Sequence, residues 1–180
     1  VGAANGVKCG SIEHKMGIHA SPTCVMHFND SKGWLVGKAN EGLACMFTMM
    51  NEARLAVALQ GVAIAERALQ QALGYARDRK QGRGDGPDAP SSVAIIEHAD
   101  VRRMLLTMRA LTAAARSICY ATAIALDRSH HDQDAAGRKA AQERTALLTP
   151  VAKAFSTDIG IEVASLGVQV HGGMGFIEET

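Results

Sequence analysis

The chain has 180 residues, enough for one hydrophobic core, and its 47% hydrophobic content includes only 4% aromatic residues. A core of aliphatic and small side chains favours packed helices over a β-sandwich. Lys and Arg total 19 and Asp and Glu total 18, so the charge balance gives no reason to expect nucleic acid as a partner.

Four cysteines are widely spaced along the chain without a CxxC pair: Cys9, Cys24, Cys45 and Cys119. With no secretory leader visible, this pattern predicts reduced thiols in a cytoplasmic protein. No run of about 18 apolar residues is free of charge, so we expect no membrane span. The chain starts at Val1 without an initiator Met and stops at Thr180 after a glycine turn. We therefore expect it to be cut from a larger protein.

Residues 1–40 differ from the rest of the chain in their glycine spacing and in the shortness of their apolar stretches. Glycines separate short apolar stretches such as Cys24–Phe28, which is followed by the turn-like cluster Asn29–Gly33. Because two to four strands do not form a stable sheet alone, we predict that residues 1–40 are the remnant of a β-domain.

From about residue 41 to residue 79 the period becomes helical. Apolar residues recur at steps of three and four: Leu55, Leu59, Val62, Ala65, Leu69, Ala72, Leu73 and Ala76. Gly61 and Gly74 each cost about 1 kcal/mol relative to Ala inside a helix, so both positions indicate close helix contacts. The Gly/Pro-rich stretch 82–92 is predicted to be a loop.

A second helix is predicted around residues 101–126, before a polar connector at residues 129–134. Its apolar stripe alternates steps of four and three: Val101, Leu105, Met108, Thr112, Ala115, Cys119, Thr122 and Leu126.

A third helical region runs from about residue 135 to residue 170. Pro150 interrupts it, either as a kink or as the first residue of a new helix capped by Thr149. Beyond Pro150 one apolar face is predicted: Val151, Phe155, Ile159, Val163, Leu166 and Val170. Gly172–Gly175 is expected to stop the helix. Residues 41–180 are therefore predicted to form an up-and-down helical bundle, with an apolar groove left for a further helix or a partner subunit.

Two metal hypotheses are weak. His130–Asp132 could ligate a metal, but a solvated turn explains these residues better because no distant ligand is evident. A di-metal carboxylate bundle needs Glu-x-x-His pairs, whereas the chain has only adjacent pairs at Glu13–His14 and Glu97–His98.

Basic side chains gather around Gly82 at the end of the first predicted helix: Arg77, Arg79, Lys80 and Arg83. They could stabilise the helix C-terminus, or they could form an anion site beside flexible backbone. The sequence pattern leaves both interpretations open. By itself, Gly172–Gly175 is most simply a helix cap, because a phosphate-binding glycine loop opens a helix instead of closing one.

Six segments occur in an order that resembles the C-terminal part of the acyl-CoA dehydrogenase family: Lys15–Thr23, Val36–Leu43, Asn51–Arg54, Tyr75–Arg83, Val151–Phe155 and Gln169–Phe176. The long loop before Ile95–His98, the following Val101–Leu105 and the stretch Leu147–Pro150 are most similar to the methylthiopropanoyl-CoA dehydrogenase branch.

The resemblance implies that the intact protein is a flavoenzyme that desaturates an acyl-CoA thioester. A glutamate would remove the α proton while the β hydrogen leaves as hydride to FAD. Family members usually place this glutamate in a Tyr-Glu-Gly-Thr-like motif, which is expected beyond Thr180, so no catalytic residue is assigned within the chain. We expect the bundle to be truncated before its last helix, and the chain alone to be inactive and without FAD.

The resemblance also implies binding residues. Contacts to FAD, partly of a neighbouring subunit, fall on Arg79, Lys80, Gln81, His98, Gln169, Gly172 and Gly173. Asn51 and Arg54 match the segment that faces the acyl-CoA. Two departures stand out: Gln81–Gly82 replaces the usual Thr-Phe, and Ala53 occupies a position where some members carry the base.

Further expectations concern partners. The family builds its flavin site between subunits, which implies a homo-oligomer, a dimer or a tetramer, with an electron-transfer flavoprotein as the electron acceptor. An acyl-CoA oxidase remains an alternative, because these motifs do not encode the acceptor. A non-enzymatic helical oligomerisation module that binds no flavin is the alternative from another class.

Overall fold

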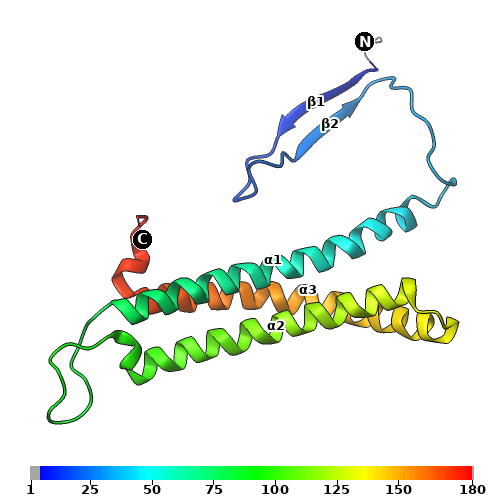
Figure 1. Cartoon of the computed structure of the whole chain (residues 1–180). Helices are drawn as coiled ribbons and strands as arrows, with labels where there is room; N and C mark the ends of the chain where they lie inside the picture. The colour runs from blue at the N-terminus through cyan, green and yellow to red at the C-terminus, as the bar shows by residue number, and fades with distance from the viewer. Residues whose placement is uncertain (1–4, 180) are drawn as a thin grey trace. The chain divides into compact units, whose positions relative to one another are not determined.

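The computed structural model describes residues 5–179, and the chain divides into two compact units, one ending at Cys45 and one beginning at Met46. The first unit contains a β-hairpin of β1 (Val7–Ile12) and β2 (Cys24–Phe28) (Figure 1). The strands predicted within residues 1–40 are therefore present, whereas the assignment of this segment to a larger β-domain stays a prediction.

The hairpin is antiparallel and irregular. Val7 lies opposite Phe28 and Ile12 lies opposite Cys24, with a register shift between Cys9 and Ser11. Such a bulge adds one residue to one strand and increases its twist.

The second unit contains most of α1 (Gly42–Asp78) and all of two further long helices, α2 (Ala99–His131) and α3 (Ala135–His171). Two short 3-10 helices, η1 (Ile95–Glu97) and η2 (Gly172–Phe176), precede α2 and follow α3. Figure 1 shows the three long helices running alongside one another. The predicted mainly helical up-and-down bundle is confirmed.

The predicted buried face of α2 is confirmed along most of its length: Leu105, Met108, Thr112, Ala115, Cys119 and Thr122 are all buried. Its two buried hydroxyls are satisfied within the helix, because Thr112 donates to the Met108 carbonyl oxygen and Thr122 to that of Ile118, each at 2.7 Å. Among residues 5–179, no helix combines the length and apolarity that crossing a membrane requires.

Helices α1 and α3 touch backbone to backbone. A Cβ added to Gly61 would lie 2.2 Å from the carbonyl oxygen of Ser156, and one added to Gly160 would lie 3.1 Å from that of Gly61. The close contact predicted at Gly61 is confirmed. The one predicted at Gly74 is wrong, because no neighbour in the described part of the chain lies within 4 Å of a Cβ added there.

This close crossing also changes which face of α3 is buried. Between residues 150 and 163 the buried side of the helix consists of mostly small residues: Ala152, Ser156, Ile159, Gly160 and Val163. Val151 and Phe155, predicted to be buried, are 46% and 37% exposed, and Leu59 of α1 is 43% exposed. Larger side chains on the contact line would hold the two helices apart.

Pro150 does not start a new helix. Helix α3 runs without interruption from Ala135 to His171, and the Thr149 hydroxyl donates to the Thr145 carbonyl oxygen inside it at 2.7 Å. The predicted cap at Thr149 is therefore wrong. The cap lies at Asp134, whose carboxylate accepts the backbone N–H of Gly137 at 2.9 Å.

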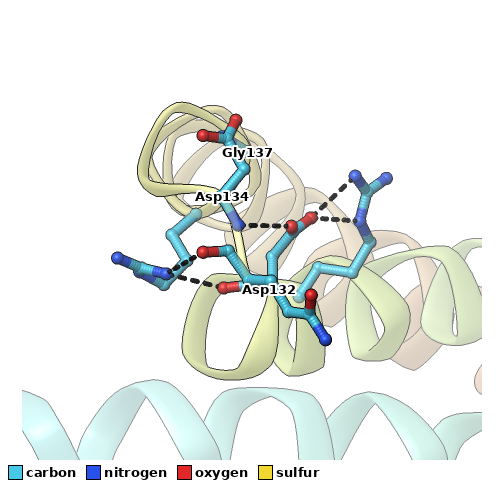
Figure 2. Close-up of polar contacts among 6 residues, drawn as sticks. Asp132, Asp134 and Gly137 are labelled. Carbon is cyan, nitrogen blue, oxygen red and sulfur yellow. Dashed lines mark hydrogen bonds and ion pairs between the residues drawn. The ribbon is translucent and has the colours of Figure 1, made fainter.

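The polar connector is shorter than predicted, because α2 extends through His131. In the remaining turn, the Asp132 carboxylate accepts from Arg128 at 2.9 Å and from the Asp134 backbone N–H at 3.2 Å, as Figure 2 shows. The hydrogen bond from Arg128, followed by that from Asp134, lowers the pKa of Asp132. In residues 5–179, no group of three or more His, Cys, Asp or Glu side chains is arranged to hold a metal ion.

Candidate functional site

The loop after α1 is ordered by a short ladder of backbone contacts. Lys80 forms an antiparallel bridge with Ala94. The Gln81 N–H donates to the Val93 carbonyl oxygen at 2.9 Å, and the Val93 N–H donates to the Gly82 carbonyl oxygen at 3.1 Å. The Gly/Pro-rich stretch is thus a loop, as predicted, but its two ends are paired. This pairing fixes the backbone of Lys80, Gln81 and Gly82 against that of Val93 and Ala94.

His98, the residue that precedes α2, contacts the backbone of this loop. Its Nε2 atom lies 2.7 Å from the carbonyl oxygen of Gln81, and because that oxygen only accepts, Nε2 carries the proton. Gly82 has φ +76°, and a Cβ added to it would lie 3.2 Å from His98 Nε2. A large side chain at position 82 would be strained, which gives a physical reason for Gly here in place of the usual Phe.

The cations of this turn are free for a ligand. Arg79 donates only a long contact of 3.4 Å to the Gln81 side-chain oxygen. Within residues 5–179, neither Arg79 nor Lys80 forms an ion pair, and both are exposed. The structure therefore brings four of the predicted residues together: Arg79 contacts the Gln81 side chain, His98 contacts the Gln81 backbone, and Lys80 lies between Arg79 and Gln81. We call residues 79–82 with His98 the basic turn.

We call residues 172–175, which end α3, the glycine stop. The end of α3 just before it contacts the last turns of α1. The rings of Tyr75 and His171 stack with their centroids 4.5 Å apart, and Tyr75 precedes Arg79 by about one helical turn. Gly172 caps α3 with φ 61°. Gln169, Gly172 and Gly173 are exposed, and no atom of residues 5–179 lies within 4 Å of a Cβ added to either glycine. The stop predicted at these glycines is confirmed, and its backbone is open to a ligand.

The two predicted substrate residues also meet. Arg54 donates to the Asn51 side-chain oxygen at 3.3 Å, and its guanidinium carbon lies 5.8 Å from the centroid of the Phe47 ring. Both residues line a hollow of about 580 Å³ between the early part of α1, the end of α2 and the Pro150 region of α3.

These residues do not join the basic turn within one chain. Arg54 and Arg79 stand 25 residues apart in the sequence, and α1 accounts for nearly all of that interval, which corresponds to roughly 37 Å along the helix axis. The predicted residues thus fall into two groups, one within the first half of α1 and one at and beyond its C-terminal end.

Sequence reasoning missed the Tyr75–His171 stack and the wall that His130 and Thr149 add to the hollow. A signal for the stack was available, since Tyr75 is one of only two tyrosines in a chain with few aromatic residues. No comparable signal existed for the wall, which depends on how α2 and α3 are packed.

Fold and site define a helical-bundle domain with a ligand-accessible basic turn at one end. The chain matches the model of the acyl-CoA dehydrogenase C-terminal domain over residues 40–180. It therefore belongs to the acyl-CoA dehydrogenase family.

Individual relatives agree. The chain is 55% identical over 176 residues to 3-methylmercaptopropionyl-CoA dehydrogenase of Ruegeria pomeroyi, covering 98% of this chain and 30% of that protein. It is 35% identical over 187 residues to a butyryl-CoA dehydrogenase of Syntrophomonas wolfei, covering 99% and 31%. The solved butyryl-CoA dehydrogenase of Megasphaera elsdenii superposes with a TM-score of 0.78 at 26% identity, covering 97% and 41%. The chain thus spans about 30% of the curated relatives' length, and the branch that the sequence indicated is confirmed.

Proposed function

We propose that the whole protein is an FAD-dependent acyl-CoA dehydrogenase, which forms a double bond between the α and β carbons of an acyl-CoA thioester. The observation that carries this proposal is the match to the family's C-terminal domain over residues 40–180. In this proposal residues 41–180 serve as the helical C-terminal domain and residues 1–40 belong to the middle β-domain.

The basic turn fits the diphosphate of FAD. Arg79 and Lys80 supply positive charge that no carboxylate of the described residues neutralises, and a guanidinium suits bidentate contact with phosphate oxygens. His98 fixes the backbone beneath them through Gln81. Gln169, Gly172 and Gly173 offer open backbone where the adenosine half would lie. When bound, FAD supplies the ring that accepts hydride.

In the first half of α1, Asn51 and Arg54 would orient the thioester. Their hydrogen bond and the Phe47 ring leave the Arg54 guanidinium half-buried at the edge of the hollow. We propose that the proton-abstracting carboxylate belongs to the Tyr-Glu-Gly-Thr-like motif that the family resemblance implies beyond Thr180, since Ala53 at the alternative position cannot abstract a proton. The name of the 55% identical relative supports a short sulfur-containing acyl group as the substrate.

The remaining partners follow from the family. Exposed apolar side chains on the helices, such as Ile64, Leu106 and Ile161, support a homo-oligomer, which we propose is a dimer or a tetramer. We propose an electron-transfer flavoprotein as the acceptor. We propose a cytoplasmic location, which the wide spacing of the four cysteines without a CxxC pair supports.

A dye-reduction assay on the purified whole protein tests the activity, with 3-methylthiopropanoyl-CoA and butyryl-CoA as substrates. We expect a yellow protein that reduces the dye with at least one thioester and consumes little oxygen. A colourless protein would favour the oligomerisation module. Rapid oxygen consumption would favour the oxidase.

A variant pair tests the basic turn. Arg79→Gln removes a charge-assisted contact and should weaken FAD retention by about tenfold to a hundredfold. The matched control is Arg144→Gln, which removes a surface arginine in the first half of α3 and should retain FAD as the parent does. Equal FAD retention by the parent and by Arg79→Gln, measured by flavin absorbance after gel filtration, would reject this assignment.

A further inference from the structure

Two cysteines share one face of the β-hairpin. Cys9 lies opposite Met26 on the neighbouring strand, and Met26 and Cys24 are two residues apart on β2. Side chains two apart on a strand point to the same face, and directly opposed residues do so as well. Cys9 and Cys24 are therefore diagonal neighbours on that face.

The β-bulge lies in the part of β1 that faces Cys24. It follows Cys9, so that the next paired residue on β1, Ser11, already lies opposite Val25. The Cys9 thiol leans in this direction, with its Sγ atom 3.4 Å from the Ser11 carbonyl oxygen.

The electrostatics of the pair agree with this geometry. A hydrogen bond with the Cys9 side chain raises the pKa of the Cys24 thiol, ahead of smaller contributions from desolvation and from the charge of Cys9. The two side chains are therefore neighbours on the face that the register assigns to both. Both thiols are free and exposed within this chain, so a dissolved oxidant can reach them.

We propose that Cys9 and Cys24 form a reversible disulfide that closes the hairpin loop when the protein meets a small-molecule disulfide. The bond would join the two strands across the loop of residues 10–23, which includes the family-like segment Lys15–Thr23. The hairpin, and with it the start of the segment that leads into α1, thereby becomes sensitive to the thiol–disulfide balance of its surroundings.

The chemistry is thiol–disulfide exchange in two steps. One protein thiolate attacks a sulfur of glutathione disulfide, which forms a mixed disulfide and releases one glutathione thiolate. The second protein thiolate then attacks the protein sulfur of the mixed disulfide, so that the Cys9–Cys24 bond forms and a second glutathione thiolate leaves. Two protein thiols are oxidised and one glutathione disulfide is reduced to two thiols, which take up the two protons.

The test is oxidation of the dilute purified chain with glutathione disulfide, followed by alkylation of free thiols, trypsin digestion and mass spectrometry. We expect the peptides that contain Cys9 and Cys24 to be linked within one chain, while Cys45 and Cys119 stay free of intramolecular links. Dithiothreitol should separate the two peptides again. A product in which both thiols carry glutathione and no linked peptide forms would overturn the proposal.

A matched variant tests the register itself. Cys9→Ser combined with Ser11→Cys moves the thiol by two residues, to a position opposite Val25 and on the other face from Cys24. Because the two Cβ atoms then point apart, linkage should be at least about tenfold slower than in the parent chain. Linkage at the parent rate would show that the strand register does not control the reaction, and would equally reject the proposal. Circular dichroism checks that the variant keeps its helical bundle.

Discussion

Helix α1 meets its two neighbours in different ways. Against α3 the backbones touch, since a Cβ on Gly61 would lie 2.2 Å from the Ser156 carbonyl oxygen. Against α2 the contact includes two long side chains, those of the Glu66–Arg116 ion pair at 2.7 Å. Beside that pair a hollow of about 540 Å³ lies between the two helices.

This difference between the two contacts predicts where the bundle tolerates substitutions. At the α1–α3 crossing there is no flexible side chain to move aside, so an added methyl group must displace a helix. Along α1–α2, side chains can change rotamer and water reaches the charged groups, so substitutions there should be absorbed locally. The α1–α3 contact thus fixes the spacing of the helices at whose ends the basic turn and the glycine stop lie.

The largest effect should come from Gly61→Ala. The new methyl group would collide with the backbone of Ser156, and we expect the free energy of unfolding to fall by about 3 kcal/mol, the upper end for overpacked cores. Urea unfolding of the parent and variant chains, followed by circular dichroism, measures the loss.

Gly74→Ala is the matched control for this substitution. It lies in the same helix with no atom within 4 Å of the added methyl group, so it should gain about 0.5–1 kcal/mol from helix propensity alone. If both variants changed stability in the same direction, the close α1–α3 contact would not be the cause.

Much of the fold could be predicted from the spacing of apolar residues. The stripe on α2 was found because Leu105, Met108 and Cys119 are large or distinctly apolar. The buried face of α3 near Pro150 was missed because Ala152, Ser156 and Gly160 carry little hydrophobic signal. A step of four between small residues was the available clue, as it permits close approach of two helices. Pro150 indicated an interruption, but α3 continues through it from Ala135 to His171.

The candidate site was predictable in its parts and not in its arrangement. Arg79, Lys80 and Gln81 are adjacent in sequence, so their grouping needed no structure. The hydrogen bond of His98 to the Gln81 carbonyl oxygen spans 17 residues and depends on the pairing within the loop. Periodicity carries no information about such a contact, and only the family resemblance pointed to His98.

A smaller loss is expected for Gly160→Ala, on the other side of the same crossing. Its methyl group would lie 3.1 Å from the Gly61 carbonyl oxygen, a tight contact that a shift of a few tenths of an ångström relieves. The gain in helix propensity offsets part of this strain, which leaves a net loss of about 1 kcal/mol. A loss as large as that of Gly61→Ala, by the same unfolding measurement, would show that the crossing cannot adjust at all.

The smallest effect should come from the α1–α2 side, through Arg116→Gln. Hydrogen bonds from Gln70 and then from Arg116 lower the pKa of Glu66, and the Arg116 and Glu66 side chains remain 38% and 30% exposed. Solvent screens such a pair, so we expect the variant to lose about 0.5 kcal/mol or less at neutral pH.

The pH dependence of that loss identifies its source. Because the pKa of Glu66 is lower in the folded chain than its ordinary value of about 4.3, the stabilisation is complete above that value and disappears as the pH falls through the folded pKa. The difference between parent and Arg116→Gln should therefore shrink at low pH and at high salt. Arg103→Gln is the control, since its pair with Asp100 lies within α2 and joins no helices. A difference that persisted unchanged in acid would mean that Arg116 stabilises α1–α2 by packing its stem rather than by charge.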